Sequence, residues 1–263
     1  MKYTFTDVEL AFLSAIFQHP LPLIVDDPFE ESTDKEIHKM WEDFLERFEA
    51  LGLLSDGNSH GNVSVDETLT EALLGCFGAQ KVISLLENEE INNVFYINGS
   101  SEVLLQKDGS KYRLTLFEKE KEFIDSFLAL TCGNVRSVGN PVMTTYQEKL
   151  QAQFFEKFLE LYENNDSEQL RKLCIQSFGE DQISMKILDD FHAQDGTILL
   201  TEQIGEPCMI LTKFKMTDGI LRFVKSIYSK KEDIVVLGQY PESQFPGVLY
   251  EWEGNKAYVN RSN

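Results

Sequence analysis

A faint internal repeat constrains the fold of this 263-residue chain more than any other feature. A unit of strand, turn, strand and helix occurs twice, about ninety-five positions apart, and helical segments precede both copies. The apolar strands of the two copies are residues 103–105, 112–116, 198–201 and 208–212. The repeat predicts two related halves, and its lack of catalytic polarity favours a binding scaffold.

Composition supplies a core and a strong negative charge. Hydrophobic residues make up 42% of the chain and 19 residues are Phe, which is ample for a folded interior. The net charge is −20, with 25 acidic and 11 basic side chains in residues 1–140 and 19 and 13 in the remainder. Lys and Arg do not cluster, so neither nucleic acid nor an anionic membrane surface is an expected partner. The acidic surface favours solubility or a basic partner.

The N-terminal residues and the cysteines predict a cytoplasmic protein. Residues 1–7 lack the apolar core and cleavage site of a secretory signal, and no apolar run approaches the length of a membrane span. The cysteines are widely spaced without a CxxC pair, namely Cys76, Cys132, Cys174 and Cys208. We expect all of them to be reduced side chains of the core.

Two capping boxes begin the first two expected helices. Thr6 and Glu9 can each satisfy a free amide at the start of a helix that reaches Phe17. Thr33 and Glu36 do the same for the most amphipathic helix of the chain, which Gly52 is expected to end. One face of that helix is apolar, with Ile37, Met40, Trp41, Phe44, Leu45, Phe48 and Leu51.

Hydrophobic periodicity predicts the remaining elements. In the first half these are a strand at 63–65, a helix at 66–88, a meander at 94–97, 103–105 and 112–116, and a helix at 118–130. In the second half they are helices at 146–163, 167–178, 182–191 and 217–228, and strands at 198–201, 208–214, 234–237, 248–252 and 257–259.

This order of elements predicts an α+β fold with antiparallel sheets and helical bundles packed on them. The small, polar segment 133–144 is the expected linker between an N-terminal half, 1–132, and a C-terminal half, 145–263. A quasi-two-fold arrangement of the halves would cover their sheet edges.

No motif in the chain fixes a reaction. The HExxH, EF-hand, zinc, GxSxG, P-loop and GxGxxG patterns are absent from the sequence. The densest group of potential ligands, residues 189–192 (Asp-Asp-Phe-His), has the composition of a solvated helix end. We therefore expect no catalytic residue, no metal and no cofactor, and a protein that is not an enzyme.

The order of elements resembles the EspG-type cytosolic chaperones of type VII (ESX) secretion. The resemblance covers most of the chain and is best at the start. There a helix at 7–17, a Pro-containing stretch at 20–28 and a long helix precede Leu51-Gly52-Leu53-Leu54 and the segment 63–74. A hairpin, a helix, a small-residue linker and a second helical block with its own strands follow.

The resemblance implies a mixed fold with a central antiparallel sheet and a non-enzymatic function. Members bind helical secretion substrates in the cytosol and keep them soluble until export. The richness in Lys, Glu, Phe and Ile suggests a low-GC Gram-positive counterpart, whose partner would be a helical-hairpin export protein of the WXG or LXG type. By the same resemblance, the partner-binding loop would be Lys107-Asp108-Gly109-Ser110.

The residues leave two other functions open. An acidic immunity protein would cap a basic toxin domain by charge complementarity, and its association would be strongly salt-dependent. An enzyme would need a pocket in which acidic groups converge with shifted pKa values. The sequence does not determine the oligomeric state.

Overall fold

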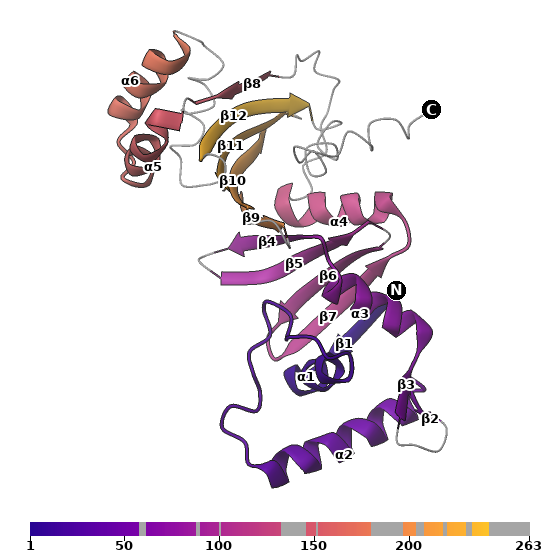
Figure 1. Cartoon of the computed structure of the whole chain (residues 1–263). Helices are drawn as coiled ribbons and strands as arrows, with labels where there is room; N and C mark the ends of the chain where they lie inside the picture. The colour runs from indigo at the N-terminus through magenta and orange to yellow at the C-terminus, as the bar shows by residue number, and fades with distance from the viewer. Residues whose placement is uncertain are drawn as a thin grey trace. The chain divides into compact units, whose positions relative to one another are not determined.

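The computed structural model contains antiparallel strands and helices in each of two units, Met1–Phe123 (unit 1) and Ile124–Asn263 (unit 2) (Figure 1). It describes residues 1–57, 62–87, 90–99, 101–132, 146–150, 152–179, 197–203, 208–217, 220–229 and 233–241. The predicted α+β class with antiparallel sheets is confirmed. None of the helices in these ranges has both the length and the apolar character needed to cross a bilayer.

Unit 1 is built on five strands in the order β1-β7-β6-β5-β4, and each strand is antiparallel to its neighbours. These strands are β1 (Lys2–Phe5), β4 (Lys81–Glu87), β5 (Glu90–Asn98), β6 (Ser101–Asp108) and β7 (Lys111–Phe117). The helices are α1 (Asp7–Ile16), α2 (Asp34–Ala50) and α3 (Glu67–Phe77). A separate antiparallel ribbon joins β2 (Leu54–Gly57) and β3 (Asn62–Val65).

One face of this sheet packs against α1, α2 and α3 in a single apolar cluster. Aromatic rings join these elements: Phe12 of α1 and Phe44 of α2 have ring centroids 5.3 Å apart, and Phe5 of β1 and Phe48 of α2 have centroids 6.1 Å apart. On the opposite face, the ring of Phe123, at the start of α4 (Glu120–Cys132), meets Phe95 edge-on at 5.6 Å. The sheet of unit 1 is thus apolar on both sides.

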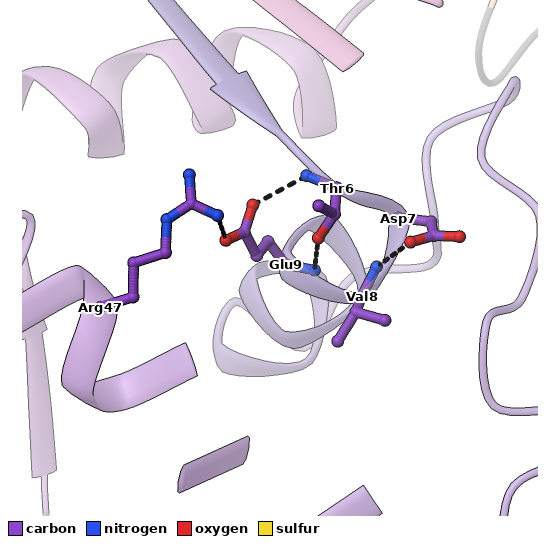
Figure 2. Close-up of polar contacts among 5 residues, drawn as sticks. All are labelled: Thr6, Asp7, Val8, Glu9 and Arg47. Carbon is purple, nitrogen blue, oxygen red and sulfur yellow. Dashed lines mark hydrogen bonds and ion pairs between the residues drawn. The ribbon is translucent and has the colours of Figure 1, made fainter. Parts of the chain in front are cut away.

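The first capping box has a further partner that fixes α1 against α2 (Figure 2). The backbone N–H of Thr6 donates to Glu9 Oε2 at 2.7 Å, and the N–H of Glu9 donates to Thr6 Oγ1 at 3.2 Å. The other carboxylate oxygen of Glu9 accepts from the guanidinium of Arg47 on α2. Only 5% of Glu9 is exposed, and a buried carboxylate needs partners for its oxygens. The Thr6 N–H and the Arg47 guanidinium supply one for each oxygen.

The strands of unit 2 follow the order β9-β10-β11-β12-β8, again with antiparallel neighbours. They are β8 (Tyr146–Lys149), β9 (Thr197–Gln203), β10 (Cys208–Thr217), β11 (Ile220–Ser229) and β12 (Ile234–Pro241). A short 3-10 turn, η1 (Ala152–Phe154), leads into α5 (Phe155–Glu163), and α6 (Ser167–Phe178) follows. Phe158, Leu170 and Cys174 of the two helices form a cluster with Val224, Val235 and Leu237 of the sheet.

The predictions of three helices, at 66–88, 146–163 and 217–228, were wrong in whole or in part. Residues 66–88 form α3 and then strand β4, because Gly78 follows the end of α3 and the run Val82–Leu85 is buried on both faces of the sheet. A short, continuously apolar run fits a buried strand as well as a helix. Of the helix expected at 217–228, residues 220–228 form most of β11 instead. The helix expected from Tyr146 is preceded by β8 and begins only at Phe155.

Several other predictions can be compared with the structure. The helix at 167–178 and the strands near 63–65, 94–97, 103–105, 112–116, 198–201, 208–214 and 234–237 are confirmed. Strands β1 and β2 were missed. The linker 133–144, the helix at 182–191 and the strands at 248–252 and 257–259 lie outside the described residues. The quasi-two-fold relation stays a prediction.

Candidate partner-binding hairpin

The four residues predicted to contact a partner lie together at the turn between β6 and β7. Asp108 pairs with Lys111 across the ladder, so the two-residue loop is Gly109-Ser110. The pair Asp108-Gly109, a common hairpin-turn dipeptide, therefore lies one residue before the centre of the loop. Gly109 has φ +61°, and a positive φ at the first loop residue alone is the type II′ pattern, which glycine adopts without strain.

Lys107 is tied to its surroundings on the side of the hairpin that faces the helices. Its Nζ lies 3.4 Å from Asp26 Oδ2 and 5.9 Å from the ring centroid of Tyr112. Partial burial would lower the pKa of Lys107, but Tyr112 and the Asp26 carboxylate outweigh burial and raise that pKa. Lys107 is therefore a fixed positive charge at neutral pH.

The opposite side of the hairpin carries a second set of polar contacts. Asp108 Oδ2 lies 3.5 Å from Arg113 Nη2. Further from the turn, Gln106 Nε2 donates to Asn93 Oδ1 at 2.9 Å, which joins β6 to β5. Both sides of the hairpin end are thus polar, whereas its stem is apolar.

The stem holds this end in place. Tyr112 is only 3% exposed and belongs to the apolar cluster of unit 1 with Leu105 and Leu114. The loop residues Gly109 and Ser110 are exposed. A two-residue loop on a buried stem presents its side chains with little loss of conformational entropy on binding.

Sequence reasoning missed three residues of this site, Asp26, Tyr112 and Arg113. The register contains the signal for two of them, because pairing residue 108 with residue 111 sets Lys107 opposite Tyr112 and Gln106 opposite Arg113. Asp26 lies 81 positions from Lys107, and only the tertiary fold brings its carboxylate to the hairpin.

The described part of the chain contains two buried free thiols, Cys76 and Cys174. Burial raises the pKa of the Cys76 thiol to about 12 and that of the Cys174 thiol to about 12, which leaves both thiols protonated at neutral pH. Among those residues, no three His, Cys, Asp or Glu side chains converge as metal ligands. The group at 189–192 lies outside them.

Comparison with known proteins gives a similarity of fold. No model of a protein family matches the chain, and no curated protein matches it in sequence. A solved structure that does match is the type VII secretion system chaperone EspG5 of Mycobacterium tuberculosis in complex with a PE25–PPE41 dimer. The TM-score is 0.56 with 10% sequence identity, and the match covers 94% of this chain and 94% of that one. At this identity the likeness establishes the fold, which is that of an EspG-type chaperone.

Proposed function

We propose that this chain is a non-enzymatic chaperone of type VII secretion that binds a helical export protein in the cytoplasm and keeps it soluble. The observation that carries the proposal is the match in fold to EspG5 over 94% of both chains. The structure of the matched chaperone contains a bound PE25–PPE41 dimer. If this chain likewise binds another protein, it must present a surface for that protein. An amphipathic helical protein exposes an apolar seam that a partner must cover before export.

The contact surface in this proposal is the β6–β7 turn, residues Lys107, Asp108, Gly109 and Ser110. Its support is geometric, because exposed loop residues are held on a buried and hydrogen-bonded stem. The Lys-, Glu-, Phe- and Ile-rich composition supports a low-GC Gram-positive counterpart of the mycobacterial chaperones, with a partner of the WXG or LXG type.

The test is to capture the tagged full-length chain from the cytosol of its source organism and to identify the bound proteins by mass spectrometry. The proposal predicts that a small helical export protein is recovered. The same export protein, expressed alone, should aggregate, and co-expression with this chain should keep it in the supernatant.

The outcomes distinguish the proposal from its main alternative. The net charge of −20 also suits an immunity protein that caps a basic toxin domain. Recovery of a basic toxin that dissociates as salt is raised would replace the chaperone proposal with that alternative. Recovery of no helical protein, together with no effect on the solubility of co-expressed export proteins, would remove the chaperone proposal.

A further inference from the structure

The end of the β6–β7 hairpin is positively charged in a strongly acidic unit. Unit 1 contains 24 acidic and 10 basic side chains, a net charge of −14. Residues 107–113, called here the basic hairpin, contain three basic side chains and one acidic side chain, a net charge of +2. Counting Asp26, whose carboxylate lies beside Lys107, the local net charge is +1, which is still opposite in sign to that of the unit.

The three positive charges lie on both sides of the basic hairpin. Lys107 shares one side with Tyr112, and strand alternation places Lys111 and Arg113 together on the other. Lys107 and Arg113 each have a carboxylate within 3.5 Å, from Asp26 and Asp108 respectively. Among the residues that the structure describes, no carboxylate lies within ion-pair distance of Lys111, whose side chain is exposed.

The carboxylates that balance the other two charges are themselves open to solvent. The Asp26 side chain is 92% exposed and the Asp108 side chain 77% exposed, so neither is locked into its pair. Exposed ion pairs of this kind are weak, and a carboxylate of a bound protein can compete with them. At about 0.15 M salt, charges more than about 8 Å apart are largely screened, so the hairpin's own charge governs a contact there.

We propose that the basic hairpin recognises acidic side chains, so that the segment of the helical partner that meets this turn carries Asp or Glu on its exposed face. This inference rests on the proposed function and adds the chemistry of the contact. Lys111 supplies the unpaired charge, while Lys107 and Arg113 exchange part of their present pairing for carboxylates of the partner. The buried Tyr112 and the two-residue loop hold these charges in fixed positions.

Photo-crosslinking from the turn tests the inference with defined probes. The full-length chain carries p-benzoylphenylalanine in place of Ser110, and a control carries it in place of Glu71, an exposed residue of α3. The probes are three synthetic peptides of about 20 residues, long enough for helicity. Two share one apolar stripe and carry either Glu or Lys on the polar face, and the third is the Glu peptide interrupted by proline.

The helical Glu peptide should crosslink at position 110 about 10-fold more efficiently than the Lys peptide. From position 71 the two peptides should crosslink with equal yield. The double variant K111E/R113E should lower the yield of the Glu peptide about 10-fold and raise that of the Lys peptide. The variant K121E changes an exposed lysine of α4 and should leave the preference unchanged.

Equal yields for the two helical peptides, or a preference for the Lys peptide, would overturn the acidic-partner inference. An unchanged preference in K111E/R113E would overturn it as well, because the charge would then come from elsewhere. If the proline-interrupted Glu peptide crosslinks as well as the helical one, the requirement for a helical partner fails while the inference about charge stands. The two proposals therefore fail separately.

Discussion

The hairpins β6–β7 in unit 1 and β9–β10 in unit 2 are similar in sequence, but the chain continues from them in different ways. After β7 it enters helix α4, whereas after β10 it adds two more antiparallel strands, β11 and β12. The sequence repeat therefore covers only its strand–turn–strand part. The two sheets still share a plan, because each is a four-stranded meander whose last strand pairs with a strand from before the helices, β1 or β8.

The segments that follow the two hairpins, α4 and β11, differ in the spacing of their buried residues. In α4, Phe123, Phe127 and Thr131 are buried while Asp125 and Ala129 between them are exposed, a pattern that fits a helix and not the alternation of a strand. In β11, Ile220, Phe223, Val224 and Ile227 fit helical spacing, but Arg222 and Ser226, which would lie on the opposite face of such a helix, are buried as well. A strand between two others buries both of its faces, and β11 pairs with β10 on one side and β12 on the other.

The largest predicted effect tests that strand arrangement in unit 2. A Cβ added at Gly238 of β12 would lie 2.3 Å from Cζ of Phe223, a ring that is almost fully buried. We expect G238V to lower the free energy of unfolding by about 3 kcal/mol, because the ring cannot move without disrupting β11. Chemical denaturation checks this.

The control for G238V is G99V in the β5–β6 loop, where an added Cβ meets no atom within 4 Å. F223L in the G238V background should restore part of the stability by removing the ring edge. If G238V and G99V destabilise equally, the packing of Phe223 on Gly238 is not the constraint that we describe.

A smaller effect is predicted for the polar bonds that fix the first helix of unit 1. E9A removes the carboxylate that caps α1 and pairs with Arg47, and should cost about 2 kcal/mol of unfolding free energy. E36A removes the equivalent carboxylate from the exposed capping box of α2 and should cost much less. Thermal denaturation of both variants compares the boxes, and equal losses would show that the buried pair with Arg47 adds nothing.

Raising the pH should destabilise both units to a similar extent. Each contains a buried thiol, Cys76 or Cys174, whose pKa burial raises to about 12. The neutral thiol is favoured in the folded state, so this stability is complete below the unfolded pKa of about 8.5 and is lost as the pH rises toward 12. At pH 10 the loss is about 2 kcal/mol for each thiol.

Alanine variants separate the thiols from the tyrosines and lysines that also titrate at high pH. C76A and C174A should each lose less stability than the wild type between pH 8 and pH 10, by about 2 kcal/mol. Chemical denaturation of each variant and of the wild type at pH 8 and at pH 10 measures these losses. A pH dependence identical to that of the wild type would mean that the thiols do not contribute.

The smallest predicted effect concerns the hairpin turn itself. G109A forces an alanine to adopt φ +61° and should cost about 1 kcal/mol. G99A, in the preceding hairpin of unit 1, replaces a glycine without a positive φ and should be close to neutral. If the two alanines cost the same on denaturation, the left-handed backbone at Gly109 is not a constraint.

Much of unit 1 could be predicted because its signals are local. The capping residues Thr6 and Thr33 mark helix starts, and alternation in residues 112–116 marks a half-buried strand. The strand β4 could not be predicted in this way, because Val82–Leu85 are all apolar or small and only the pairing with β5 decides their conformation. For β11 a signal was overlooked, since Asp218-Gly219 stands between two strand-length apolar runs.

The candidate site was predictable only in part for the same reason. The family resemblance pointed to Gly109 and its neighbours, and the ladder register would have added Tyr112 and Arg113. Asp26 comes from a segment with no regular structure, and its position beside Lys107 depends on the burial of Ile24 and Val25 in the core of unit 1.

The central claim is that a helical export protein binds at the β6–β7 turn of unit 1. Hydrogen–deuterium exchange on the full chain, alone and in complex with the helical protein captured from the cytosol, tests it most directly. The account predicts that peptides covering residues 107–113 gain protection in the complex and that K111E/R113E reduces that gain. Protection confined to α2 or to β11, with residues 107–113 unchanged, would contradict the account.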